Sequence, residues 1–241
     1  VTSFKLFMAY PGRLMLEDAE IARVMRRAAD LGALVCLHAE DGHAIEALVR
    51  AARERGDLAP RVHAATRPAH LETAAVRRAI ALREQAGCQL LVVHVSAGES
   101  AEAIGGARAR DSRVHGETCP QYLLLTDAQY EEPGFGGAKY VMSPPLRPKG
   151  HDDRLWAALA EGALETVGTD HCPFWRRDKE RGRDDFSLIP NGGPGIEHRL
   201  ALLYDAGVRT GRLTVNRWVE VCASAPARLF GLALRKGGVA A

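Results

Sequence analysis

The sequence predicts an α/β fold built on a parallel sheet that helices cover on both faces. Short apolar runs alternate with longer stretches of helical spacing along the 241 residues. The runs at residues 33–38 and 89–95 are almost continuously apolar, which is typical of strands buried on both faces. Periodicity alone leaves open whether this sheet is doubly wound or belongs to a (β/α) barrel.

Five strands are predicted, and one or more helices follow each of them. The strands are expected at residues 4–8, 33–38, 89–95, 113–117 and 165–169. The helices are expected at residues 18–31, 44–55, 69–85, 100–110, 151–161, 195–206, 214–223 and 226–232. The first helix is expected to place Ile21, Met25, Ala28 and Leu31 on one face, and Gly32 provides its C-terminal stop.

The segments between these elements divide into irregular and charged stretches. Residues 58–68 and the Gly- and Pro-rich stretch 126–149 are expected to be irregular, and residues 176–185 to form an exposed charged loop. Because the sequence contains no internal repeat or low-complexity tract, we interpret residues 1–241 as a single domain.

Composition excludes several functional classes. The formal net charge is only +2, which argues against a nucleic-acid or membrane surface as partner. No apolar run reaches the roughly 18 residues that a membrane span needs. The five cysteines are widely spaced and include no C-x-x-C pair, so we expect reduced thiols in a cytoplasmic protein rather than a thiolate zinc site.

Groups suited to metal ligation or acid–base chemistry stand on or after the predicted strands. Lys5 lies on the first, His38 ends the second, and His94 lies near the end of the third. The fourth leads into Glu117, and the fifth is followed by Asp170. In a barrel these ends converge on one face, where two imidazoles and a carboxylate would suit Zn²⁺ or a similar divalent metal. Taken singly, a strand-end histidine is more often structural, and Asp170 could simply cap the next helix.

Lys5 is the most informative of these residues, because burying an ammonium group is costly. On a strand its side chain shares a face with Ser3 and Phe7. If that face points into a barrel, burial lowers the lysine pKa and populates the free amine, which can react with carbon dioxide to give a metal-bridging carbamate. The alternative is a lysine in water on an edge strand.

Seven segments, in order along the chain, resemble the dihydropyrimidinase/D-hydantoinase family of the amidohydrolase superfamily. They are SFKLFMAY (3–10), LHAE (37–40), VHVS (93–96), ETCPQYL (117–123), MSPPLR (142–147), GTDHCPF (168–174) and IPNGGPGIE (189–197). The resemblance implies a (β/α)8 TIM barrel of the metal-dependent hydrolase type, of which this chain would form the later portion with about five βα units.

The resemblance also implies a metal centre. Lys5 would be a carbamylated ligand bridging two divalent metal ions, with zinc as the expected metal. His38 and His94 would bind the second metal, and Asp170 would bind the first and shuttle a proton.

Three further residues would contact the substrate if the resemblance holds. Tyr10 would donate a hydrogen bond to the developing oxyanion, and the backbone groups of Ser143 and Asn191 would bind the ring amide. The implied activity is metal-dependent hydrolysis of the cyclic amide bond in hydantoins or dihydropyrimidines, which gives N-carbamoyl amino acids. A small-molecule substrate and a homotetrameric full-length protein are the expected partners.

Alternatives to this activity are an allantoinase or dihydroorotase, or a non-catalytic scaffold like the neuronal dihydropyrimidinase-related proteins. The scaffold is disfavoured because the four ligand positions that this chain covers are all present. The chain departs from the family in having no His-x-His motif, which supplies two ligands, and neither part of the small β-sandwich. We therefore expect a catalytic-barrel domain that is incomplete at both ends and inactive by itself.

Overall fold

A parallel sheet with its strands in sequential order forms the centre of the molecule. The computed structural model describes residues 2–233 and 235–238. The strands are β1 (Ser3–Phe7), β2 (Leu34–His38), β3 (Gln89–Val92), β4 (Val114–Thr118) and β5 (Thr166–Val167), paired in that order. A doubly wound sheet reverses its strand order at a switch point, whereas a barrel keeps it. The order in the described residues is therefore that of a barrel.

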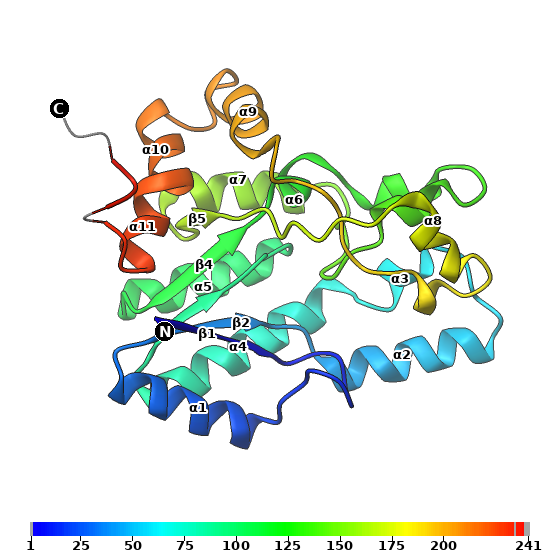
Figure 1. Ribbon diagram of the computed structural model, residues 1–241, viewed down its shortest axis with the longest axis horizontal. Coiled ribbons are helices and arrows are strands. Elements are labelled where there is room, and N and C mark those ends of the chain that lie inside the picture. Colours follow the sequence, from blue (N-terminus) through cyan, green and yellow to red (C-terminus); the bar gives the residue numbers. More distant parts are fainter. Residues whose placement is uncertain (1, 234, 239–241) are drawn as a thin grey trace.

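Four helices pack against one another in succession along one side of the sheet (Figure 1). They are α1 (Asp18–Asp30), α4 (Ala69–Ala86), α5 (Gly98–Arg110) and α7 (His151–Glu161). The other α-helices are α2 (Gly42–Glu54), α3 (Val62–Ala65), α6 (Pro120–Leu124), α8 (Arg176–Lys179), α9 (Arg199–Leu203), α10 (Val215–Val219) and α11 (Ala225–Leu229). No helix in the described part of the chain is long and apolar enough to cross a membrane.

The two faces of the sheet contribute to two different apolar clusters, because alternate residues of a strand point to opposite faces. Helix-facing strand residues join the main core: Val35, Leu37, Leu90 and Val92. The opposite face carries a smaller cluster onto which Leu229 and Phe230 pack: Leu34, Cys36, Leu91 and Val93. Lys5 is in register with Cys36, so its side chain stands on this second face, opposite α1, α4, α5 and α7.

Two stretches expected to be irregular contain short helical turns. Residues 58–68 include α3, whose His63 is buried and bonds through Nε2 to the carbonyl of Met142 at 2.7 Å. The stretch 126–149 includes the 3₁₀ turns η1 (Asp127–Glu131) and η2 (Gly136–Tyr140). Such single turns lack the periodicity that identifies longer helices in a sequence.

The C-terminal helices are more continuous than predicted. The helices expected at residues 214–223 and 226–232 form one helical run, in which the π-helical turn η6 (Glu220–Ser224) joins α10 to α11. Pro226 lies in the first turn of α11, where its missing N–H is tolerated. Similarly, α9 continues into a second π-helical turn, η5 (Tyr204–Val208).

The expectation of an exposed loop at residues 176–185 is wrong for its centre. These residues form α8 and the 3₁₀ turn η3 (Glu180–Gly182), followed by η4 (Phe186–Leu188). Lys179 is only 4% exposed, and its ammonium group donates to three backbone carbonyls. Charge density suggested solvent exposure, but carbonyl acceptors supplied by the fold can compensate a buried ammonium group.

Candidate metal-binding and catalytic site

The ends of β2 and β3 bring two predicted ligands into direct contact. Nδ1 of His38 and Nε2 of His94 are 2.9 Å apart, and both side chains are buried. The rings meet edge to face, with their centroids 4.5 Å apart. Burial, together with the charges of His38 and Lys5, holds the pKa of His94 well below its usual range. His94 is therefore a neutral imidazole, the form that binds metal ions.

A buried carboxylate supports His38 from the other side of its ring. Nε2 of His38 lies 2.8 Å from Oε2 of Glu40, which is also buried. Burial alone would raise the pKa of Glu40, but the hydrogen bond and charge of His38, with Arg67 and Arg147 nearby, lower it. A carboxylate on the far nitrogen of a histidine is the usual outer partner of a metal ligand, because it fixes the tautomer and leaves the other nitrogen free to bind.

Lys5 and Asp170 are both exposed, and the charge of each affects the pKa of the other. Loss of hydration lowers the pKa of Lys5 despite its exposure, while the charges of Asp170, Cys36 and Glu117 oppose this change. Loss of hydration likewise raises the pKa of Asp170, which is also exposed, against the charges of Lys5 and His38. Both directions favour the neutral forms that proton transfer and amine chemistry need.

The predicted ligand side chains supply only part of the donor set that a divalent metal ion needs. Among residues 2–233 and 235–238, no three His, Cys, Asp or Glu side chains are grouped closely enough to hold a metal ion, so Asp170 does not join His38 and His94 in such a group. The chemistry of the imidazole pair nevertheless fits. His38 has its carboxylate partner, and Nδ1 of His94 is a buried polar atom without a hydrogen bond.

Three of the predicted site residues have an unusual backbone conformation. Tyr10 (φ 68°), His94 (φ 43°) and Asp170 (φ 47°) are the non-glycine residues with positive φ in the described chain. Each such conformation costs on the order of 1–3 kcal/mol, and residues of this kind cluster at active sites and ligand clamps. All three are among the residues that the sequence predicts for the site.

Tyr10 and Ser143, both predicted to contact substrate, line one cavity of about 170 Å³ together with Glu40 and Arg67. The Tyr10 ring lies beside the His38 ring, with centroids 5.3 Å apart. Burial and the charge of Glu40 raise the pKa of Tyr10 to about 12, although the nearby Ser143 hydroxyl opposes this. Ser143 Oγ itself is buried without completing a hydrogen bond. The phenol therefore stays protonated at neutral pH and available as a donor.

Comparison with known proteins tests the family resemblance that the sequence motifs indicate. No family model matches this chain. The D-hydantoinase of Streptomyces coelicolor is 51% identical over 241 residues, which cover 100% of this chain and 51% of that protein. The solved D-hydantoinase of a Bacillus sp. AR9 superposes with a TM-score of 0.98 at 48% identity, covering 100% of this chain and 53% of the other. This chain belongs to the D-hydantoinase/dihydropyrimidinase family.

A second solved relative, the dihydropyrimidinase of Brevibacillus agri, gives the same TM-score of 0.98 at 48% identity, over 100% of this chain and 52% of that one. The predicted fold class, part of an amidohydrolase TIM barrel with about five βα units, is thereby confirmed. The chain spans about half the length of the curated relatives it matches.

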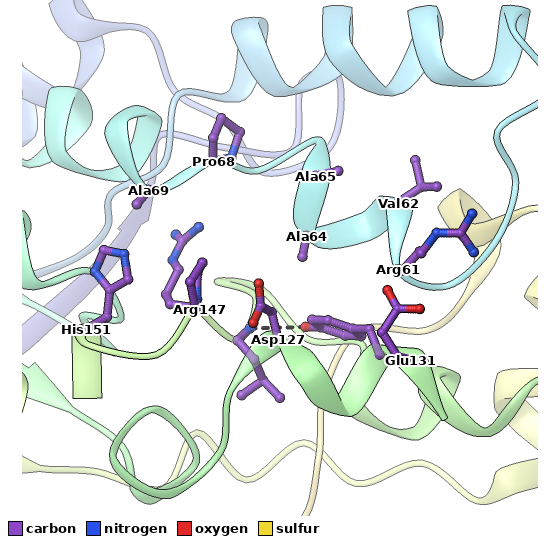
Figure 2. Close-up of a pocket in the computed structure, with 13 residues that line it drawn as sticks. Arg61, Val62, Ala64, Ala65, Pro68, Ala69, Asp127, Glu131, Arg147 and His151 are labelled. Atoms are coloured by element: carbon purple, nitrogen blue, oxygen red, sulfur yellow. Dashed lines mark hydrogen bonds between the residues drawn. The ribbon is translucent and has the colours of Figure 1, made fainter. Parts of the chain in front are cut away.

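A separate cavity of this hydantoinase-family chain is not the predicted site. It measures about 450 Å³ and lies between α3, the start of α4 and η1, with Arg147 and His151 on its wall (Figure 2). None of the predicted site residues lines it. The Arg147 guanidinium on its wall already donates hydrogen bonds within the protein, to Ser96 Oγ and to Glu72 Oε2, each at 2.9 Å.

Reasoning from sequence missed one carboxylate of this family member, Glu40, and named another, Glu117, without giving it a role. Glu40 was noted only as part of a motif, although an acidic residue two positions after a strand-end histidine was the available signal. Burial raises the pKa of the Glu117 carboxyl group, although the charge of Lys5 acts in the opposite direction. This carboxyl group lies against Gly168, where an added Cβ would stand 2.7 Å from the Glu117 carboxyl carbon, so a larger residue at 168 would displace that carboxyl group.

Proposed function

We propose that this chain is a catalytic-barrel domain of a metal-dependent hydrolase that opens cyclic amides of the hydantoin or dihydropyrimidine type to N-carbamoyl amino acids. The observation that carries the proposal is the buried pair formed by His38 Nδ1 and His94 Nε2 at 2.9 Å, with Glu40 behind His38. The names of its relatives, D-hydantoinase and D-phenylhydantoinase, support the substrate class.

The residues proposed to hold two metal ions, with zinc expected, are Lys5 as a carbamate, His38, His94 and Asp170. A bound metal would supply Lewis acidity, which lowers the pKa of water and polarises a carbonyl oxygen. To form the carbamate, the free amine of Lys5 would attack the carbon of carbon dioxide. One N–C bond forms, one C=O π bond opens with its electron pair passing to oxygen, and the nitrogen releases one proton to water. The lowered pKa of Lys5 supports this step because it increases the fraction of free amine.

The remaining chemistry belongs to the side chains and the backbone. A water oxygen attacks the ring carbonyl carbon, the C–N bond breaks, and Asp170 carries a proton from that water to the leaving ring nitrogen. The raised pKa of Asp170 suits such a carrier, because it brings the group nearer to neutral pH. The protonated phenol of Tyr10 donates to the oxygen on which negative charge develops. The backbone groups of Ser143 and Asn191 hold the ring amide.

The cellular compartment and the oligomeric state of the protein are also part of the proposal. The five cysteines carry no disulfide, and four of them are buried, which supports a reducing, cytoplasmic compartment. We further propose a homotetramer for the working enzyme. The 241-residue chain by itself is expected to be inactive, because the family's His-x-His ligands are not among its residues.

The test combines metal binding with catalysis. Zinc binding to the 241-residue chain is measured by titration calorimetry. Opening of hydantoin and dihydrouracil is then assayed in a chimera in which this chain replaces the matching half of the Streptomyces coelicolor D-hydantoinase. We expect ring opening that His94→Ala abolishes and that His43→Ala, a change at an exposed histidine, leaves intact. A folded chimera that binds zinc but opens neither ring would instead support the non-catalytic scaffold.

A further inference from the structure

Lys179 is a buried lysine without an acidic partner. It ends α8 and is 4% exposed, and in the described part of the chain it forms no ion pair. Burial lowers the pKa of its ammonium group to about 8, with only the Cys172 thiol acting in the opposite direction. A desolvated ammonium group is tolerated only where hydrogen bonds replace its water, so its acceptors reveal what the residue does.

All three acceptors are backbone carbonyls from two segments that are distant in sequence. Nζ donates to Val141 O at 2.8 Å, to Pro190 O at 2.7 Å and to Gly192 O at 2.8 Å. These bonds use the three N–H groups that an ammonium offers. A backbone bond from Gly192 N to Val141 O, at 3.0 Å, also joins the two segments directly. Lys179 therefore holds residues 141 and 190–192 together.

The two segments carry the residues proposed to bind the ring amide. Asn191 lies between the two carbonyls of its segment that accept from Nζ, and Ser143 follows Val141 by two residues. The intervening Met142 has a partner of its own, because its carbonyl accepts from His63 Nε2 at 2.7 Å. A shift of either segment would therefore change the separation of the two amide-binding positions.

We propose that Lys179 is a positioning residue whose ammonium group sets the separation of the Ser143 and Asn191 segments and thereby the affinity of the site for the cyclic amide. The substrate part of this proposal rests on the function proposed above. The structural part concerns the tie that Lys179 makes by hydrogen bonds between residue 141 and residues 190–192, and it does not depend on the proposed function.

Hydrogen exchange followed by mass spectrometry on the 241-residue chain tests the tie. Lys179→Met removes all three donors, and Lys179→Gln keeps two N–H donors without charge, so it remains informative if the Met variant does not fold. Lys139→Met is the matched control, because Lys139 lies on neighbouring η2 but is 57% exposed and pairs with Glu132. We expect exchange in peptides covering 141–143 and 190–192 to be fastest in the Met variant, slower in the Gln variant and unchanged in the control. Wild-type exchange in a folded Lys179 variant would overturn the tie.

Steady-state kinetics on the chimera with the Streptomyces coelicolor sequence test the consequence for substrate. Loss of a charge-assisted positioning contact is expected to raise KM for hydantoin about tenfold in Lys179→Met and less in Lys179→Gln, with kcat changed far less. A KM that stays at the wild-type value while exchange increases would overturn the role in substrate binding. An inactive wild-type chimera would count against the proposed function alone, and the exchange experiment would still decide the tie.

Discussion

Nδ1 of His38 and Nε2 of His94 face each other at 2.9 Å, and Oε2 of Glu40 lies 2.8 Å from the other ring nitrogen of His38. The two facing atoms, Nδ1 and Nε2, come from neighbouring parallel strands, one at the end of β2 and the other just beyond β3. Two buried imidazoles cannot both be charged at this separation, and the pKa of His94 is lowered accordingly. Two imidazole nitrogens held this close together are donors of the kind that bind zinc.

Replacing Glu40 by Gln tests whether the carboxylate supports a metal ligand. Loss of such an outer partner typically weakens metal affinity about 10- to 100-fold, because the histidine loses its fixed tautomer and orientation. We expect this loss in zinc titrations of the 241-residue chain. The matched control is Glu17→Gln, since Glu17 bonds to His43 at 3.1 Å but both side chains are exposed. Equal zinc affinity in the wild type and in Glu40→Gln would refute the supporting role.

Replacing Tyr10 by Phe tests the phenol as an oxyanion donor. Removing one such donor typically lowers kcat about 10²- to 10³-fold, while binding of the ground-state substrate changes little. The ring remains to pack beside His38, so the fold should be retained. The assay is hydantoin hydrolysis by the chimera, and Tyr204→Phe, at an exposed tyrosine, is the control. A kcat within a factor of two of the wild-type value would show that the phenol does not act on the transition state.

Sequence predicted the strands and the histidines at their ends because both leave local signals. Buried parallel strands appear as apolar runs, and the His38 and His94 motifs stand at the ends of two such runs. The barrel was not decided by periodicity, because strand order depends on contacts between distant segments. The role of Lys179 could not be predicted either. Its partners are backbone carbonyls, which every residue carries, so no side-chain pattern marks them.

Replacing Arg147 by Met tests a buried ion pair that braces the third strand end. Arg147 is paired with Glu72 at 2.9 Å, and both side chains are buried. Glu72 also accepts the backbone N–H groups of Ser96 and Ala97 at 3.2 and 3.0 Å. Removing one partner leaves an uncompensated buried charge, so we expect a loss of about 3–5 kcal/mol in the free energy of unfolding.

Urea denaturation measures this loss. Arg209→Met is the control, because its pair with Asp205 is an exposed i,i+4 pair worth about 0.3–0.5 kcal/mol. If the two variants unfold at the same urea concentration, the buried pair contributes no more than a surface one, and the proposed bracing of the His94 segment is wrong.

The pH dependence of stability provides a separate test of Lys179. Its pKa falls from the ordinary value of 10.5 to about 8 on folding, because burial disfavours the charged form. Below pH 8 the lysine is charged in both states, and its burial opposes folding in full. Between pH 8 and 10.5 the unfolded chain binds more protons than the folded one, so this contribution to stability rises with pH, by at most about 1.4 kcal/mol per pH unit. We expect the free energy of unfolding of the wild type, relative to Lys179→Met, to increase over this range in urea titrations at successive pH values. A flat or falling difference would mean that the folded protein does not disfavour the charged lysine, and that the three carbonyls compensate its desolvation completely.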